Sequence, residues 1–334
     1  MKKITIVLSL ILIIISCKKV IVQDYVTLAG TITNQNSDSL WIRSRGYKKI
    51  IKVNEDGTFM DTLKVEKGSY RLLDGKEGGT TLYLKNGFDL KLSLDTKEFD
   101  ETIIYDGIGA EANNYLAKKA LLNEKEVNLK EFMSLDRVSF DEKLNTVNSK
   151  FKSLLGSTKN LDSAFLANEE NVIEKMSNQL MVMFERKQAL LAMNGQASPK
   201  FVDYENHAGG NTSLDDLKGK YVYIDMWATW CAPCKREIPF LKEVEKAYHD
   251  KNIEFVSISV DRKKDYEAWK TMVDDKELGG IQLYSNRDIN FSKAYKVSAI
   301  PRFILIGPEG DVVASEAPRP SDDKLKELFK SLNI

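Results

Sequence analysis

The chain has 334 residues, enough for two or three domains, and its 43% hydrophobic content is sufficient for a packed core. Basic and acidic residues both number 49, so the formal net charge is +0. Because no basic cluster stands out, the composition argues against nucleic acid as a partner. The three cysteines are too few for a framework of structural disulfides.

The N-terminus has the features of an export signal. Two lysines precede the apolar run Ile4–Ile15, which is too short to span a bilayer comfortably. The run ends in Ile14-Ile15-Ser16-Cys17, which resembles the lipobox of bacterial lipoproteins. That resemblance implies a signal peptide over residues 1–17 and a lipid on Cys17 that holds the protein on a membrane. The alternatives are an ordinary cleaved signal that ends at Cys17 and an uncleaved anchor.

Residues 25–107 are predicted to form a small antiparallel β-domain. Eight short runs in which apolar and polar residues alternate are separated by turn residues, a pattern typical of a β-sandwich or barrel. Asp56-Gly57 and Asn86-Gly87 are predicted to be hairpin turns. We find no catalytic constellation in this domain.

Residues 108–194 are predicted to form an α-helical region. This segment has no proline, and apolar residues recur at helical spacing along it. Breaks near residues 123–128, 135–139 and 156–160 give three or four helices.

Residues 198–334 alternate between strand and helix patterns. The order predicts a mixed sheet flanked by helices, so the whole chain is assigned to the α/β class with a β-domain and a helical segment before its last domain.

Two cysteines lie at a change from strand to helix. Tyr221–Asp225 is a β-branched and aromatic run typical of a buried strand, and the segment after Cys234 carries one apolar helical stripe. Cys231 is therefore placed at a helix start, where unpaired N–H groups favour a thiolate. Pro233 is tolerated there because first-turn N–H groups have no helical partner. We predict a redox pair in which only Cys231 is accessible to solvent.

A Cys-x-x-Cys motif is also common as half of a zinc-binding site. Zinc needs two further ligands at suitable spacing, and the chain offers only Cys17, His207 and His249. Both histidines are isolated, so we predict no metal site.

The run Lys218–Pro239, which contains Trp-Cys-Ala-Pro-Cys, resembles the TlpA/ResA branch of membrane-tethered thioredoxin-fold thiol-disulfide oxidoreductases. Ile300-Pro301 and the turn at 307–310 extend the resemblance over residues 198–334. The β-domain in turn resembles a module of unknown role that precedes thioredoxin domains in some Gram-negative envelope lipoproteins. Together these resemblances imply a lipid-anchored protein of a Gram-negative-type cell envelope that faces the periplasm.

The resemblance implies roles for the two cysteines and for two carboxyl groups near them. Cys231 would be the attacking thiolate and Cys234 the resolving thiol. Asp225 matches the buried carboxylate of thioredoxins, and Glu237 matches an acid found near the pair in this branch. Such carboxyls would exchange protons with Cys234. A solvated surface residue is the alternative for Glu237.

The resemblance also implies a substrate-binding surface formed by Trp230, Pro233, Ile300 and Pro301. Pro301 would follow a cis peptide bond and expose the backbone of Ile300 to an extended peptide. Trp230 would pack beside the pair and shield it.

The implied activity is the reduction of disulfides in envelope proteins, with electrons from an inner-membrane thiol donor and no cofactor besides the Cys231–Cys234 disulfide. Ala232 stands where thioredoxin usually has glycine, and this position influences the redox potential, so both directions of electron flow stay open. The alternatives are a thiol peroxidase and a partner-binding lipoprotein with a subsidiary redox domain.

Overall fold

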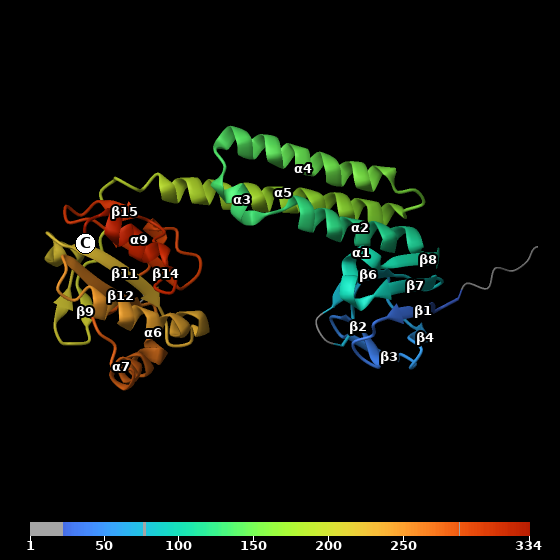
Figure 1. Ribbon diagram of the computed structural model, residues 1–334, viewed down its shortest axis with the longest axis horizontal. Coiled ribbons are helices and arrows are strands. Elements are labelled where there is room, and N and C mark those ends of the chain that lie inside the picture. The colour runs from blue at the N-terminus through green and yellow to red at the C-terminus, as the bar shows by residue number, and fades with distance from the viewer. Residues whose placement is uncertain (1–22, 76–77, 287) are drawn as a thin grey trace, which may run out of the picture. The chain divides into compact units, whose positions relative to one another are not determined.

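The computed structural model describes residues 23–75, 78–286 and 288–334 (Figure 1). The predicted export signal and its lipidation site, Cys17, lie outside these residues. Within the described ranges, no helix is both long enough and apolar enough to cross a bilayer.

The chain divides into two compact units, Met1–Asn178 and Gln179–Ile334, and the division falls inside the long helix α5 (Ser163–Leu191). As far as it is described, the first unit opens with two four-stranded sheets, of strand order β4-β1-β7-β8 and β3-β2-β5-β6. Neighbouring strands are antiparallel except β1 and β7, which run parallel. The strands are β1 (Val26–Thr33), β2 (Ser39–Ser44), β3 (Tyr47–Lys52), β4 (Thr58–Leu63), β5 (Gly68–Leu73), β6 (Gly79–Leu84), β7 (Asp89–Asp95) and β8 (Ile104–Ile108).

The two sheets share one apolar core. Along β7, Leu90, Leu92 and Leu94 are buried while the residues between them are exposed, as the period of a strand requires. The core joins residues of both sheets, among them Leu28 of β1 and Leu72 of β5. The predicted β-domain is confirmed as a largely antiparallel sandwich.

The two turns predicted as hairpins connect strands of different sheets. Asp56-Gly57 lies between β3 and β4, and Asn86-Gly87 lies between β6 and β7. Both glycines have positive φ, 80° at Gly57 and 93° at Gly87, so the turns themselves are present. The hairpin predictions are wrong because turn residues fix only the local reversal, whereas burial of the apolar face decides which sheet the next strand joins.

Helices follow the sheets, with breaks where the sequence predicts them. Asn128 and Asp136 cap α3 and α4 by accepting hydrogen bonds from backbone N–H groups. Asn113 attaches α2 to the sheet, because its side chain bonds the N–H and the C=O of Tyr83 at 2.8 and 3.0 Å. The helices are α2 (Ala110–Glu126), α3 (Leu129–Ser134), α4 (Arg137–Ser157) and α5, with the single turn α1 (Phe99–Thr102) before β8.

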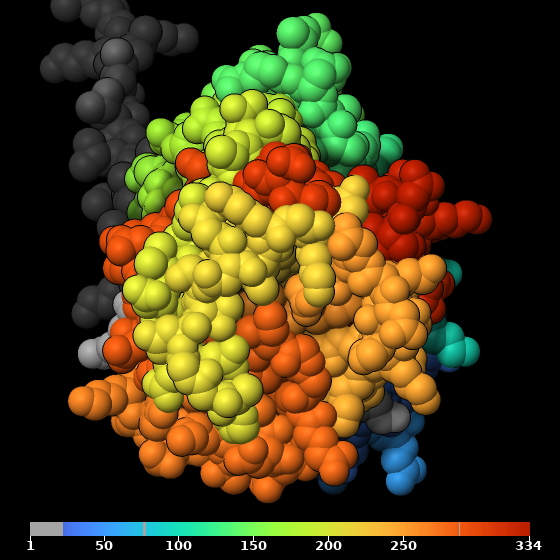
Figure 2. Space-filling model, turned by 90° about the vertical axis from the view of Figure 1, so that its left-hand side faces the viewer, coloured from blue at the N-terminus to red at the C-terminus, as the bar shows by residue number. Residues whose placement is uncertain are grey.

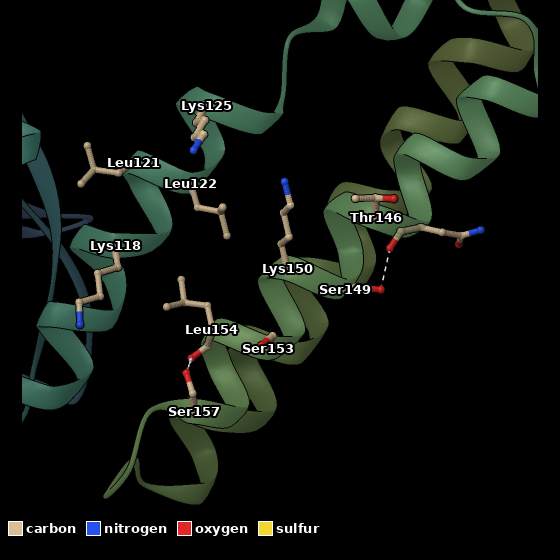
Figure 3. A pocket seen from close by; sticks show the side chains of 11 residues that line it. Lys118, Leu121, Leu122, Lys125, Thr146, Ser149, Lys150, Ser153, Leu154 and Ser157 are labelled. Atoms are coloured by element: carbon tan, nitrogen blue, oxygen red, sulfur yellow. Dashed lines mark hydrogen bonds between the residues drawn. The ribbon is translucent and has the colours of Figure 1, made fainter.

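An open groove lies between α2 and α4 (Figure 3). Leu122 and Leu154 project into it from the two helices, and Lys150 stands beside them. Lys118 and Lys125 also line it. The groove therefore combines an apolar floor with a basic rim.

The second unit contains a mixed sheet of strand order β10-β9-β13-β12-β11-β14-β15. β11, β12 and β13 are parallel, and β14 is antiparallel to β11. The strands are β9 (Tyr204–Asn206), β10 (Asn211–Thr212), β11 (Tyr221–Trp227), β12 (Ile253–Ser259), β13 (Ile281–Tyr284), β14 (Arg302–Ile306) and β15 (Val312–Ala314). The helices are α6 (Ala232–Ala247), α7 (Tyr266–Asp275), α8 (Asn290–Ala294) and α9 (Lys324–Ser331).

The central strand β11 is covered on both faces. Ile224 packs in a cluster with Phe291 of α8, and Tyr223 packs in another with Leu241 of α6 and Phe329 of α9. Figure 2 shows one face of this unit, where its N-terminal part (yellow) lies beside later segments (orange), as the pairing of β9 with β13 requires. The predicted mixed sheet flanked by helices is confirmed.

Candidate active site

The cysteine pair lies where β11 passes into α6. The strand ends at Trp227, and a tight turn follows in which Cys231 N donates to the Ala228 carbonyl at 3.0 Å. Cys231 is the N-cap of α6, and its Sγ accepts the N–H of Cys234 at 3.1 Å. The two sulfurs form a disulfide with a Cα separation of 5.3 Å. In the reduced protein, the N–H groups of this first turn would stabilise a thiolate on Cys231.

Both cysteines are buried in this oxidised form. Cys231 is 4% exposed and Cys234 is 3% exposed, so the prediction that only Cys231 is accessible is wrong for the disulfide. Pro233, in the first turn of α6, is exposed. The surface around the pair is therefore formed by the turn itself while the sulfurs lie beneath it.

Trp227, and not Trp230, covers the pair. Trp230 is 60% exposed, so its predicted shielding role is wrong. Trp227 is 2% exposed and packs in one cluster with both cysteines and the fully buried Trp269. The end of a buried strand provides this position, whereas Trp230 falls in the turn beyond it.

The segment before β14 reaches the pair from a distant part of the sequence. The Ile300–Pro301 peptide bond is cis, as predicted. The carbonyl oxygen of Ile300 lies 3.7 Å from Cys231 Sγ. This approach follows from the sheet order, because β14 pairs with β11 and places Arg302 opposite Met226.

Asp261 anchors the turn that carries the cysteines, and the sequence analysis missed it. Thr229 donates its backbone N–H to Asp261 at 3.0 Å and its hydroxyl at 2.8 Å. Ser259 adds a hydrogen bond to the same fully buried carboxylate at 2.9 Å. The turn after β11 is thus tied to the end of β12.

Asp225 is buried in β11, as predicted. Its side chain is among the buried polar groups at 8% exposure, and Oδ1 has no hydrogen-bond partner within the described residues. Burial, together with the nearby carboxylates Glu237 and Glu245, raises the pKa of Asp225 to about 8. A proton is therefore held on this group near neutral pH.

Glu237 is also buried, at 7% exposure, so the solvated alternative is wrong. Its carboxylate accepts hydrogen bonds from Ser321 N at 3.1 Å and Ser321 Oγ at 3.0 Å. Arg319 adds an ion pair at 3.3 Å. These contacts tie α6 to the segment before α9.

Glu245 is a second residue that the sequence analysis missed as a functional candidate. It stands within the apolar stripe of α6, and a charged residue in such a stripe is the signal that could have identified it. Burial raises the pKa of Glu245 to about 7, against the opposing charge of Lys242.

The histidines that were weighed as zinc ligands each contact a different carboxylate. His207 contacts Asp274 at 3.2 Å, and His249 contacts Asp250 at 2.9 Å. Within the residues that the structure describes, no three His, Cys, Asp or Glu side chains are grouped so that they could hold a metal ion.

Comparisons with known proteins agree with this geometry. A family model described as Redoxin matches residues 193–332. The thiol-disulfide oxidoreductase ResA of Bacillus subtilis (strain 168) is 36% identical over 120 residues, which cover 36% of this chain and 64% of the relative. ResA of a Bacillus cereus strain is 32% identical over 140 residues, which cover 41% of this chain and 78% of the relative.

Two solved structures from Bacteroides are also similar. The thioredoxin domain of a thiol-disulfide oxidoreductase from Bacteroides vulgatus is 29% identical, with 42% of this chain and 96% of that chain covered and a TM-score of 0.38. A thiol:disulfide interchange protein from Bacteroides sp. is 30% identical, with 42% and 91% covered and a TM-score of 0.38. Because the Bacillus cereus relative is 32% identical and 78% of its length is covered, the chain belongs to the ResA family of thiol-disulfide oxidoreductases.

Proposed function

We propose that the protein reduces disulfides of envelope proteins through the Cys231–Cys234 dithiol. The observation that carries the proposal is the position of Cys231 Sγ, which accepts the Cys234 N–H at the start of α6 and lies 3.7 Å from the Ile300 carbonyl. In the reduced protein, the N–H groups at the start of the helix would stabilise a reactive thiolate on this sulfur. The backbone beside it could pair with an extended substrate peptide.

The reaction proceeds in two exchanges. The Cys231 thiolate attacks one sulfur of the substrate disulfide, which forms a mixed disulfide and releases the other substrate sulfur as a thiolate. Asp225 in its ionised form then accepts the proton of Cys234, and the Cys234 thiolate attacks Cys231 Sγ. The second substrate sulfur leaves, so the substrate gains two electrons and the cysteine pair becomes a disulfide. An inner-membrane dithiol donor reduces the pair again, and the pair is the only redox group required.

Trapping tests this function. Cys234→Ser should accumulate mixed disulfides with envelope proteins through Cys231, visible as thiol-sensitive bands that mass spectrometry identifies. Cys231→Ser is the matched control and should trap none. Bands that are equally strong in both variants and that persist after treatment with a thiol reductant would contradict the proposal.

Membrane attachment through a lipid on Cys17 belongs to the same proposal and is supported by the Ile14-Ile15-Ser16-Cys17 motif. Wild-type protein should incorporate labelled fatty acid and sediment with membranes of the envelope. Cys17→Ser should do neither. Sedimentation of Cys17→Ser with membranes would contradict attachment by lipid.

A partner-binding role of the first unit is a second candidate, and the groove between α2 and α4 favours it. Lys118 and Lys125 stand near the leucines of its floor, which suits an acidic amphipathic segment. Leu122→Asp should reduce trapping of native partners while leaving the reduction of a small disulfide unchanged. Unchanged trapping would contradict this role.

A thiol peroxidase has less support. The Thr229 hydroxyl is engaged with Asp261 at 2.8 Å. We therefore expect no hydrogen peroxide turnover by the reduced protein in a coupled assay.

A further inference from the structure

A narrow crevice lies on the inner side of the cysteine pair. Cys234, Asp225 and Glu245 all line it, together with Trp227, Ser257 and Gln282. Its volume of about 10 Å³ is close to that of a single water-sized sphere. The crevice thus connects the resolving cysteine, the buried carboxyl and a second carboxyl on α6.

Three buried polar atoms on residues of this crevice have no hydrogen-bond partner among the described residues: Asp225 Oδ1, Trp227 Nε1 and Gln282 Oε1. Gln282 Nε2 donates to the Gly279 carbonyl at 2.7 Å, which fixes the amide and makes Oε1 its free acceptor. The residues that line this water-sized space thus offer one donor and two acceptors, which are the partners that an ordered water requires. The crevice is therefore built to hold water between the carboxyls.

The local backbone makes room for Glu245. Oε2 of Glu245 lies 2.6 Å from the point where a Cβ would stand at Gly279, and Oε1 lies 3.1 Å from the corresponding point at Gly280. A side chain at Gly279 would displace the carboxyl, and a Cβ at Gly280 would first meet the Phe255 carbonyl oxygen at 2.6 Å. Lys242, one turn earlier on α6, donates to the Lys276 carbonyl at 2.9 Å. Its ammonium group is thus bound at the edge of the crevice.

The charged groups that face Glu245 are few. Lys242 lies on its own helix, Asp225 lies on β11, and the wall from Leu278 to Gln282 contributes no titratable side chain. Glu245 and Asp225 have pKa values of about 7 and about 8, both raised by burial, and the charge of Glu245 raises that of Asp225. Protons can thus pass between the two groups near neutral pH without a large difference in free energy.

We infer that Glu245 relays the proton of Cys234 between Asp225 and solvent through the water-sized crevice. The inference rests on the proposed function, because it concerns the resolving step. Asp225 first releases its proton across the crevice to Glu245 and on to solvent, the ionised Asp225 then accepts the proton of Cys234, and the Cys234 thiolate attacks Cys231 Sγ. Glu245 acts through Asp225 and is a positioning residue of this proton path.

Stopped-flow reaction of the reduced full-length protein with 5,5′-dithiobis(2-nitrobenzoate) separates the two steps. Attack by Cys231 releases the first thionitrobenzoate, and attack by Cys234 releases the second as the disulfide closes. Thionitrobenzoate leaves as an anion and takes no proton from the protein. The pH dependence of the second phase therefore reports the deprotonation of Cys234. Both phases would be followed from about pH 5.5 to about pH 9, a range that brackets the titration of both carboxyls.

Glu245→Gln should slow the second phase about tenfold at pH 7 and remove its inflection near that pH, because the relay group is lost, whereas the first phase should be unchanged. Glu245→Asp should restore the inflection. Glu243→Gln, an exposed position on the same helix, is the matched control and should behave as wild type. Circular dichroism confirms that each variant is folded.

Second phases of wild type and Glu245→Gln that superimpose at every pH would overturn the relay, as would equal loss of the inflection in Glu245→Asp. Failure of the proposed function looks different, because Cys234→Ser would then trap no envelope partner through Cys231 whatever the behaviour of Glu245.

Discussion

Cys231 Sγ lies 3.7 Å from the carbonyl oxygen of Ile300, although 69 residues separate them along the chain. The sheet order produces this approach, since β14 lies directly beside β11. The sulfur also caps α6, so one atom meets both the helix N-terminus and a backbone acceptor. This relationship is the structural basis for assigning attack to Cys231.

The position of Cys231 predicts a reactive thiol in the reduced protein. Because the first-turn N–H groups favour the thiolate, we expect Cys231 in Cys234→Ser to be alkylated with an apparent pKa below the value of about 8.5 for a free cysteine. Iodoacetamide labelling across pH, with quantification by mass spectrometry, measures it. An apparent pKa at or above that of free cysteine would contradict the assignment.

Asp225 should make the folded protein less stable as pH rises. Its pKa is about 8 in the fold and about 4 in the unfolded chain, so between these values the folded state binds more protons and stability falls with increasing pH. The contribution is on the order of 5 kcal/mol across this window, and Asp225→Asn should lack it.

Urea denaturation of the oxidised protein from about pH 4 to about pH 8 measures the effect across the window between the two pKa values. Asp250→Asn, at an exposed position, is the control and should follow wild type. Parallel pH profiles for wild type and Asp225→Asn would show that Asp225 does not bind its extra proton in the folded state.

Asp261 should contribute to stability through the turn before Cys231. Asp261→Ala would leave the Thr229 and Ser259 hydroxyls without their common acceptor. We expect a loss of about 2–4 kcal/mol in the free energy of unfolding, since several buried hydrogen bonds to a charged group disappear together. Asp250→Ala should cost almost nothing, and equal stability of the two variants would contradict the anchoring role.

Glu237 should act on structure more than on thiol chemistry. Ser321→Ala removes one of its hydrogen bonds, and Glu237→Gln removes its charge and the Arg319 ion pair. We expect each to lower the free energy of unfolding by about 1–2 kcal/mol, with non-additive effects in the double variant. A rate of disulfide reduction that falls in Glu237→Gln but not in Ser321→Ala would instead support the proton-exchange role that the family resemblance implies.

The fold of the second unit and the cysteine site could be predicted because their signals are local. The strand Tyr221–Trp227, the helix after Cys231 and the proline at 301 each carry their pattern within a few residues. The position of Cys231 at a helix start follows directly from that pattern.

The remaining features depend on contacts between distant residues. Asp261 lies 32 residues from Thr229, and only the pairing of β11 with β12 brings them together. Trp227 and Trp230 are alike in the sequence, and only the end of the strand decides which one is buried. Glu245 resembles an ordinary helix residue until the crevice and the glycines opposite it are seen.

The reduction potential of the Cys231–Cys234 pair tests the central claim most directly. It is measured by equilibrating the purified full-length protein in defined dithiothreitol buffers and quantifying free thiols by alkylation. A reductase of envelope disulfides should have a value near thioredoxin's, about −270 mV. A value near about −120 mV, that of a strong oxidant, would contradict the proposed direction of electron flow.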